Sequence, residues 1–111
     1  MTPVERPILT VLTTVDSAEV AQELARGAVG ARLAACAQIG APVTSVYQWE
    51  GEVQTAQEWQ VVFKTTEDAY PALEAHLLAA HPYDTPEVIA TPVVRAAAGY
   101  RAWAAAEVRG E

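Results

Sequence analysis

The sequence predicts an α+β fold in which four strands and two helices follow one another as strand, helix, strand, strand, helix, strand. β-Branched and apolar runs typical of strands occur at residues 8–14, 43–66 and 88–94. Apolar residues recur at helical spacing between these runs, and Glu50-Gly51 divides the longest run as a hairpin turn would. An antiparallel sheet with both helices on one face fits every connection, and the length suits a single domain over residues 1–111.

The first strand and the first helix are predicted from residues 8–33. Residues 8–14 are mostly β-branched or apolar, which is typical of a buried strand. Asp16 is the predicted N-cap of the helix, because Glu19 follows at the spacing of a capping box. The helix is expected to run from about Ser17 to Leu33. Its apolar stripe consists of Ala21, Leu24, Ala25, Ala28 and Val29.

A long hairpin is predicted in the middle of the chain. Residues 35–50 indicate a strand that is interrupted near Pro42, since proline cannot donate to a central ladder. Residues 52–66 return as the partner strand after the turn. The hairpin carries Tyr47 and Trp49, and exposed aromatic residues beside a strand edge favour self-association. The alternative is a twisted hairpin whose aromatic residues face solvent.

The second half of the chain completes the predicted fold. Asp68 is the expected cap of the second helix, which ends at His81 because a proline follows. Residues 88–94 form the last strand, and Pro92 within it indicates the edge of the sheet. Residues 100–108 form a short alanine-rich helix. The order is therefore the ferredoxin-like βαββαβ arrangement, with a long hairpin between the second and third strands and a C-terminal helix.

Charge and cysteine content narrow the function. The chain has 14 acidic and 7 basic residues and a net charge of −7, which argues against nucleic acid as a partner. Cys36 is the single cysteine, so no internal disulfide can form, which suits a reducing compartment. Residues 1–7 lack the pattern of a signal peptide, and no apolar run approaches the ~20 residues that span a bilayer. We therefore expect a cytoplasmic protein with no membrane partner.

Five short segments of the chain form a recognisable set. They are RLAAC at residues 32–36, TSVYQWEG at 44–51, FKT at 63–65, HPYDTPE at 81–87 and YRAW at 100–103. Together they resemble the CutA family of divalent-cation tolerance proteins, and they follow the family's order across nearly the whole chain. The set is far more specific than any one segment alone.

The resemblance implies a homotrimer of ferredoxin-like subunits in which the long hairpin is engaged between subunits. It also implies a link to tolerance of divalent metal ions, notably copper. We therefore expect copper or another divalent cation to be bound weakly, and the protein to bind rather than catalyse. No reaction is implied, so the chain is expected not to be an enzyme.

His81 is the candidate metal ligand. The family's copper proposals use a cysteine at the end of the first strand and two adjacent histidines before the proline. Those positions correspond here to Thr13, Ala80 and His81, so only the histidine is a candidate ligand. A site shared between subunits is one interpretation of His81, and a helix-terminal histidine favoured by the helix dipole is the other.

A second candidate site would bind a small molecule or cofactor near a subunit boundary. Its expected residues are Trp49, Glu58, Lys64, Tyr83 and Glu87. Lys64 lies in an apolar strand and would be costly to bury alone, so it should reach a carboxylate or face a cleft. A structural ion pair is the alternative interpretation of this lysine.

Three other functions fit the sequence less well than metal-linked binding. A trimeric signalling module of the PII kind, which holds a small molecule between subunits, remains the alternative. An acylphosphatase-like enzyme would need an arginine cradle after the first strand, where the chain has Thr14-Val15-Asp16. RNA recognition disagrees with the acidic charge and with the absence of basic-aromatic strand motifs.

Overall fold

The computed structural model describes residues 6–109, which form three helices and five strands. In chain order the elements are β1 (Ile8–Val15), α1 (Ala18–Gly30), β2 (Cys36–Ile39), β3 (Val43–Trp49), β4 (Glu52–Thr66), α2 (Tyr70–Ala80), β5 (Ile89–Pro92) and α3 (Ala98–Glu107). The predicted order is confirmed, and the predicted interruption of the second strand separates β2 from β3.

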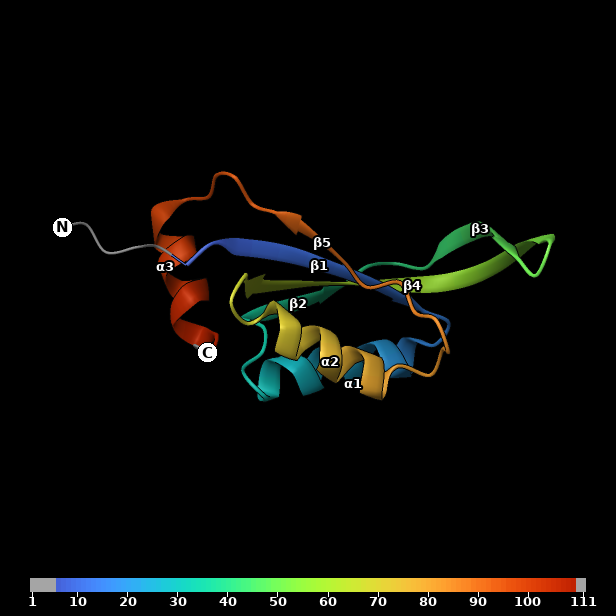
Figure 1. The fold of residues 1–111 in the computed structure, drawn as a ribbon, viewed down its shortest axis with the longest axis horizontal. Helices are drawn as coiled ribbons and strands as arrows, with labels where there is room; N and C mark the ends of the chain where they lie inside the picture. Colours follow the sequence, from blue (N-terminus) through green and yellow to red (C-terminus); the bar gives the residue numbers. More distant parts are fainter. Residues whose placement is uncertain (1–5, 110–111) are drawn as a thin grey trace.

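All strand pairs are antiparallel, as predicted. The strand order is β2-β4-β1-β5, and β3 pairs with the first half of β4, residues 52–58 (Figure 1). The register places Phe63 of β4 opposite Val11 of β1 on one side and Ala37 of β2 on the other. β5 lies at the edge beside β1, which is where Pro92 was predicted to be tolerated.

The core lies between the sheet and the two longer helices. Figure 1 shows α1 and α2 on the same side of the sheet. Val11 and Phe63 from the sheet meet Leu24 of α1 and Leu73 and Leu77 of α2, and all five side chains are buried. This contact explains the helical spacing of the apolar residues, because each helix turns its apolar stripe toward one sheet face.

The N-cap of α1 differs from the prediction. Ser17, not Asp16, occupies the cap position with an extended backbone, and its Oγ accepts a hydrogen bond from the Val20 amide at 3.2 Å. The prediction was wrong by one residue because both side chains can cap a helix, and only the residue directly before the first helical turn can reach that amide.

α1 ends at Gly30, three residues before the predicted end at Leu33. Arg32 adopts the left-handed conformation with φ of 61°, which reverses the chain. The Arg32 amide donates to the Val29 carbonyl and the Leu33 amide to the Ala28 carbonyl, both at 3.0 Å. This pattern is a Schellman motif, in which a non-glycine residue takes the position that glycine usually occupies.

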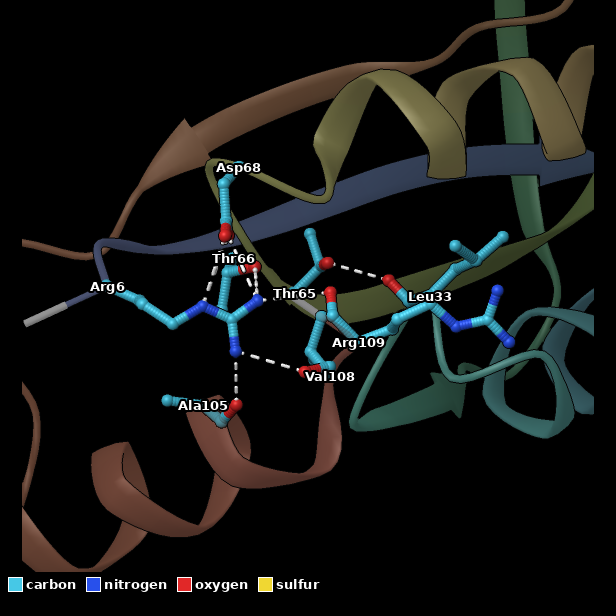
Figure 2. A network of polar contacts seen from close by, with 8 residues as sticks. All are labelled: Arg6, Leu33, Thr65, Thr66, Asp68, Ala105, Val108 and Arg109. Atoms are coloured by element: carbon cyan, nitrogen blue, oxygen red, sulfur yellow. Dashed lines mark hydrogen bonds and ion pairs between the residues drawn. The ribbon is translucent and has the colours of Figure 1, made fainter. Parts of the chain in front are cut away.

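A network around Arg6 attaches α3 to the rest of the chain (Figure 2). Arg6 Nη1 donates to the carbonyl oxygens of Ala105 and Val108 at 2.6 and 3.0 Å. Its Nη2 lies 3.1 Å from the Asp68 carboxylate. Asp68 therefore does not cap α2 as predicted: Ala69 occupies that cap without a side-chain hydrogen bond. A cation at the carboxyl end of α3 is favourable because unpaired carbonyls gather there.

Arg32 supports the same end of α3. Its side chain donates to the carbonyl oxygens of Ala106 and Glu107, both at 3.1 Å. α3 thus ends against two guanidinium groups, one from just before β1 and one from just after α1. Its buried residues, Ala104 and the following Val108, pack against Ile8 in a second small core.

The hairpin of β3 and the far half of β4 extends away from the body of the subunit (Figure 1). The radius of gyration is 15.0 Å, compared with about 13 Å expected for a compact chain of this length. Glu50 and Gly51 both have positive φ, of 51° and 80°, which identifies the predicted tight turn. β3 pairs only with β4, so its outer edge has no strand partner among residues 6–109.

The sheet face opposite α1 and α2 carries an apolar row. Leu12 of β1 lies directly between Val62 of β4 and Ile89 of β5 in the register, so the three side chains share that face. Ile89 is 52% exposed. α3 covers only the end of the sheet far from the hairpin (Figure 1). One subunit therefore leaves an apolar strip of its sheet open.

Replacing Thr13 with valine is expected to stabilise the subunit by about 1 kcal/mol, because it removes a buried hydroxyl with no partner. Thr13 is fully buried, and its Oγ1 is the one such side-chain atom without a hydrogen bond in the described part of the chain. Urea unfolding at fixed protein concentration would measure the gain.

Thr65→Val is the matched control for this substitution. The Thr65 hydroxyl is also buried, but it donates to the Leu33 carbonyl at 2.7 Å (Figure 2). Its loss should destabilise the subunit by about 1–2 kcal/mol. Equal effects of the two substitutions would contradict the assignment of Thr13 as unpaired.

Candidate functional site

A cleft of about 560 Å³ lies between the hairpin and the loop that follows α2. This volume is in the usual range for small-molecule sites. The lining residues come from the end of β1, from both hairpin strands and from the loop: Thr14, Ser45, Val46, Tyr47, Trp49, Glu58, Tyr83, Asp84, Thr85 and Glu87.

In the hairpin, Tyr47 and Trp49 of β3 lie on the same sheet face as Glu58 of β4. Val43 of β3 lies opposite Glu58 of β4, so these residues share a sheet face. Tyr47 and Trp49 follow Val43 at even spacing along β3 and therefore lie on the same face. The two residues are 43% and 48% exposed in one subunit, so they offer apolar surface to a ligand that enters the cleft.

His81 fixes the loop to the end of β1. Its Nε2 lies 2.9 Å from the Thr14 carbonyl oxygen, and its Nδ1 accepts from the Tyr83 amide at 3.2 Å. A carbonyl can only accept, so Nε2 carries the proton and the ring is the neutral Nε2–H tautomer. The Tyr83 ring packs edge-on against His81 with 4.7 Å between ring centroids.

Tyr83 and Glu58 close one wall of the cleft. The Tyr83 hydroxyl donates to Glu58 Oε2 at 2.7 Å, and the glutamate is only 7% exposed. Burial, followed by the hydrogen bond to Glu58, raises the pKa of Tyr83 well above the ordinary value of a tyrosine. Tyr83 therefore holds its proton and acts as a donor to the carboxylate.

Tyr83→Phe is expected to lower the free energy of unfolding by about 1–2 kcal/mol at neutral pH, because Glu58 loses its donor. The wild-type contribution is complete below about pH 10, the unfolded pKa, and is lost as pH rises toward the higher folded pKa. Stability should therefore fall less steeply above pH 10 in the variant. Denaturant unfolding between neutral and alkaline pH measures both effects.

Tyr70→Phe controls for this result, because Tyr70 donates to Glu74 on α2 at 2.8 Å, outside the cleft. Burial, followed by the hydrogen bond to Glu74, raises the pKa of Tyr70, and the hydrogen bond to Cys36, followed by burial, raises the pKa of Tyr100. Some alkaline loss should therefore persist in every variant. An alkaline slope identical in wild type and Tyr83→Phe would contradict the role of Tyr83.

The cleft is acidic. Glu58, Asp84 and Glu87 contribute carboxylates, and no lysine or arginine lines it among the residues that the structure describes. Such a lining favours a cation over a phosphate or another anion, because unlike charges attract and a buried carboxylate gains most from a partner.

The structure brings together four of the five residues predicted for this site. Trp49, Glu58, Tyr83 and Glu87 line the cleft, but Lys64 does not. The Lys64 ammonium donates to Gln38 Oε1 at 2.7 Å, rather than to a carboxylate, and lies 3.9 Å from Cys36 Sγ. Lys64 lies six positions after Glu58 along β4, a strand distance of about 20 Å.

The other lining residues of the cleft were not among the predicted site residues. Tyr47 could have been found, because it shares a predicted strand face with Trp49. Asp84 and Thr85 lie within the loop motif that was recognised, between two residues that were chosen. Thr14 and Ser45 carry no such signal, since only the folded register places them at the cleft.

The candidate metal positions do not converge within one subunit. Both His81 nitrogens have backbone partners, and Thr13 is buried on the helix-covered face. Within residues 6–109, no group of three or more histidine, cysteine, aspartate or glutamate side chains could hold a metal ion. The metal role of His81 stays a prediction, and coordination would require one of its hydrogen bonds to break.

Residues 9–107 match the family described as CutA1 divalent ion tolerance protein. The chain belongs to the CutA1 family. A divalent-cation tolerance protein CutA from Thermus thermophilus is 44% identical over 93 residues, which is 84% of this chain and 90% of the relative. The relative of the same name from Escherichia coli is 38% identical over 99 residues, covering 89% and 88% of the two chains.

Solved CutA1 structures share the fold of this CutA1 chain. The protein from Oryza sativa superposes with a TM-score of 0.92 at 39% identity, covering 95% of this chain and 96% of the other. The Thermus thermophilus structure gives 0.90 at 40% identity and covers 92% and 99%. Within residues 6–109, no helix is both long and apolar enough to cross a bilayer.

Proposed function

We propose that this CutA1 protein acts in divalent cation tolerance, chiefly toward copper, as a trimer of single CutA-like domains that binds ions rather than catalysing a reaction. The family assignment supports the link to divalent cations. The observation that carries the trimer is the open sheet face, where Leu12, Val62 and Ile89 form an apolar row.

The extended hairpin is the second support for assembly. Val46 and Val53 near its tip are 65% and 67% exposed, and the outer edge of β3 is unpaired among residues 6–109. Apolar side chains beside an open strand edge favour pairing with another chain. Ring closure by three copies would bury the apolar row and the hairpin edge together, because each copy presents the same two surfaces.

Binding between subunits reconciles the family's link to metal with the geometry of one chain. A single subunit supplies no group of three or more ligands within its described residues. In a trimer, a ligand residue near the three-fold axis would be present three times around one point, and a residue near a subunit boundary could meet ligands of the neighbouring subunit. The candidates are His81, which needs rearrangement, and the cleft carboxylates.

Binding rather than catalysis is supported by the surroundings of the single thiol. Cys36 Sγ lies 3.5 Å from the Tyr100 hydroxyl and 3.9 Å from the Lys64 ammonium, so neither of these neighbours is an imidazole base. The relatives are named for tolerance of cations, not for a reaction.

A cytoplasmic location is also proposed, on the argument that one free cysteine suits a reducing compartment. The names of some relatives state other cellular locations: one from Arabidopsis thaliana is called chloroplastic, and one from Archaeoglobus fulgidus is called periplasmic. Cell fractionation with antibody detection tests this proposal, and recovery from a periplasmic or organellar fraction would overturn it.

The second candidate is a PII-like module that holds a small molecule between subunits. The cleft favours this candidate, since its 560 Å³ volume is far larger than a bare metal ion fills and two of its walls are aromatic. The acidic lining of one subunit repels phosphates, so a nucleotide would bind only if assembly adds basic residues to the cleft.

Calorimetry of the assembled protein separates the two candidates. Copper(II) should bind with saturation, and His81→Gln should weaken binding at least about tenfold if this imidazole is a ligand. ATP should give no heat of binding. Saturable ATP binding without copper binding would favour the PII-like function, and unaltered copper affinity in His81→Gln would remove that histidine from the site.

A further inference from the structure

We propose that the cleft between the hairpin and the loop after α2 binds an organic cation, namely an ammonium group attached to an apolar body. This goes beyond metal tolerance and does not depend on it. Four features of the same cleft support this proposal: its volume, its aromatic walls, its charge and the position of Glu58.

The volume and the walls indicate an organic ligand. About 560 Å³ holds a molecule of many atoms, whereas a dehydrated metal ion needs only its first ligand shell. Tyr47 and Trp49, both nearly half exposed in one subunit, line the cleft from the hairpin, and Tyr83 lines it from the loop. Covering this apolar surface with an apolar group of the ligand lowers the free energy of the complex.

The charges indicate a cation. Glu58, Asp84 and Glu87 line the cleft, and the described lining contains no basic residue to neutralise them. Aromatic faces also attract ammonium groups, most strongly those of tryptophan. Carboxylates and aromatic rings together therefore recognise an ammonium group with an apolar body, and they repel a carboxylate or a phosphate.

Glu58 is the group expected to meet the ammonium. It is more than nine-tenths buried, and it lines the cleft. Tyr83 donates to Oε2, and no described residue donates to Oε1. A buried carboxylate with one engaged oxygen can accept a charge-assisted hydrogen bond at the other. Tyr83 thereby orients the carboxylate and is a positioning residue for Glu58.

The test uses three probes with the same phenyl body and different charge: benzylammonium, benzyl alcohol and benzoate. Calorimetry is performed on the full-length assembled protein at neutral pH. We expect benzylammonium to bind with saturation below about 10 mM, and benzyl alcohol to bind at least about tenfold more weakly. Benzoate should not bind.

Two carboxylate variants locate the charge. Glu58→Gln keeps the shape of the side chain and should weaken benzylammonium at least about tenfold. Glu74→Gln is the matched control, because Glu74 also accepts from a tyrosine hydroxyl, at 2.8 Å, but lies on α2 outside the cleft. It should leave the affinity unchanged. Trp49→Leu should weaken benzylammonium about threefold or more, through loss of the ring face.

Several results would overturn the proposal. They are equal affinity for benzyl alcohol and benzylammonium, an unaltered affinity in Glu58→Gln, or no binding of benzylammonium to an assembled, folded protein. Competition supplies a further outcome: copper(II) or magnesium alone displacing benzylammonium with Glu58-dependent affinity would assign the cleft to inorganic cations. Copper binding elsewhere, without displacement, leaves the metal function and this proposal both standing.

Discussion

Arg6→Ala is expected to lower the free energy of unfolding by about 3 kcal/mol, because several charge-assisted hydrogen bonds are lost together. The carbonyls of Ala105 and Val108 would lose their donor, and Asp68 would lose its cation (Figure 2). Part of the loss would be recovered where water reaches the carbonyls. Denaturant unfolding measures the effect, and hydrogen exchange should show α3 losing protection before the core helices.

Three other arginine variants make this prediction specific. Arg6→Lys keeps the charge but not the fork of donors, so most of the loss should remain. Arg32→Ala removes contacts of a more exposed side chain to the same helix end, and its effect should be smaller. Arg26→Ala, on the exposed face of α1, should be nearly neutral. An Arg6→Ala protein with wild-type stability and α3 protection would contradict the role assigned to this network.

Val62→Glu is expected to dissociate the assembly into single subunits. Val62 belongs to the apolar row on the open sheet face, where it lies between Leu12 and Gln38 in the register. Burying an unpaired carboxylate there costs several kcal/mol in each copy, and three copies would bring like charges into one interface. Size-exclusion chromatography with light scattering measures the change in mass.

Leu78→Glu is the matched control for the assembly. Leu78 is an exposed apolar residue of α2, which covers the opposite side of the sheet (Figure 1). The mass should stay that of wild type. A Val62→Glu protein that remains fully assembled at micromolar concentration would show that the apolar row is not the contact surface.

Secondary structure was largely predictable because it depends on short-range pattern. Within β4, residues 61–65 alternate between buried and half-buried side chains, and the Glu50-Gly51 turn requires the positive φ that its glycine accepts. The helix boundaries were less predictable. Asp16 and Ser17 compete for one cap, and the end of α1 depends on Arg32 taking a conformation that is unusual for a residue with a side chain.

The site was predictable where residues are close in the sequence or share a strand face. Alternation correctly grouped Glu58 and Lys64 on one face of β4, but a shared face does not mean contact. Lys64 lies beside Cys36 in the register, at the other end of the sheet from the cleft. Its partner Gln38 belongs to β2, and the pairing of β2 with β4 follows from the tertiary fold alone.

The Arg6 network could not be predicted from the sequence, because it too depends on contacts between distant residues. Arg6 and Ala105 are 99 residues apart, and nothing in a short segment marks an arginine as the partner of a distant helix end. The carbonyls it binds belong to the backbone, so residue identity gives no signal. Such contacts become visible only when the strand and the helix meet in space.

The most direct test of the assembly is sedimentation equilibrium of the wild-type protein at micromolar concentration, with circular dichroism of the same sample. We predict a folded species with three times the 11.8 kDa mass of the chain. A well-folded species of 11.8 kDa that stays in solution would contradict the account, because one subunit would then tolerate its open apolar row and its extended hairpin without a partner.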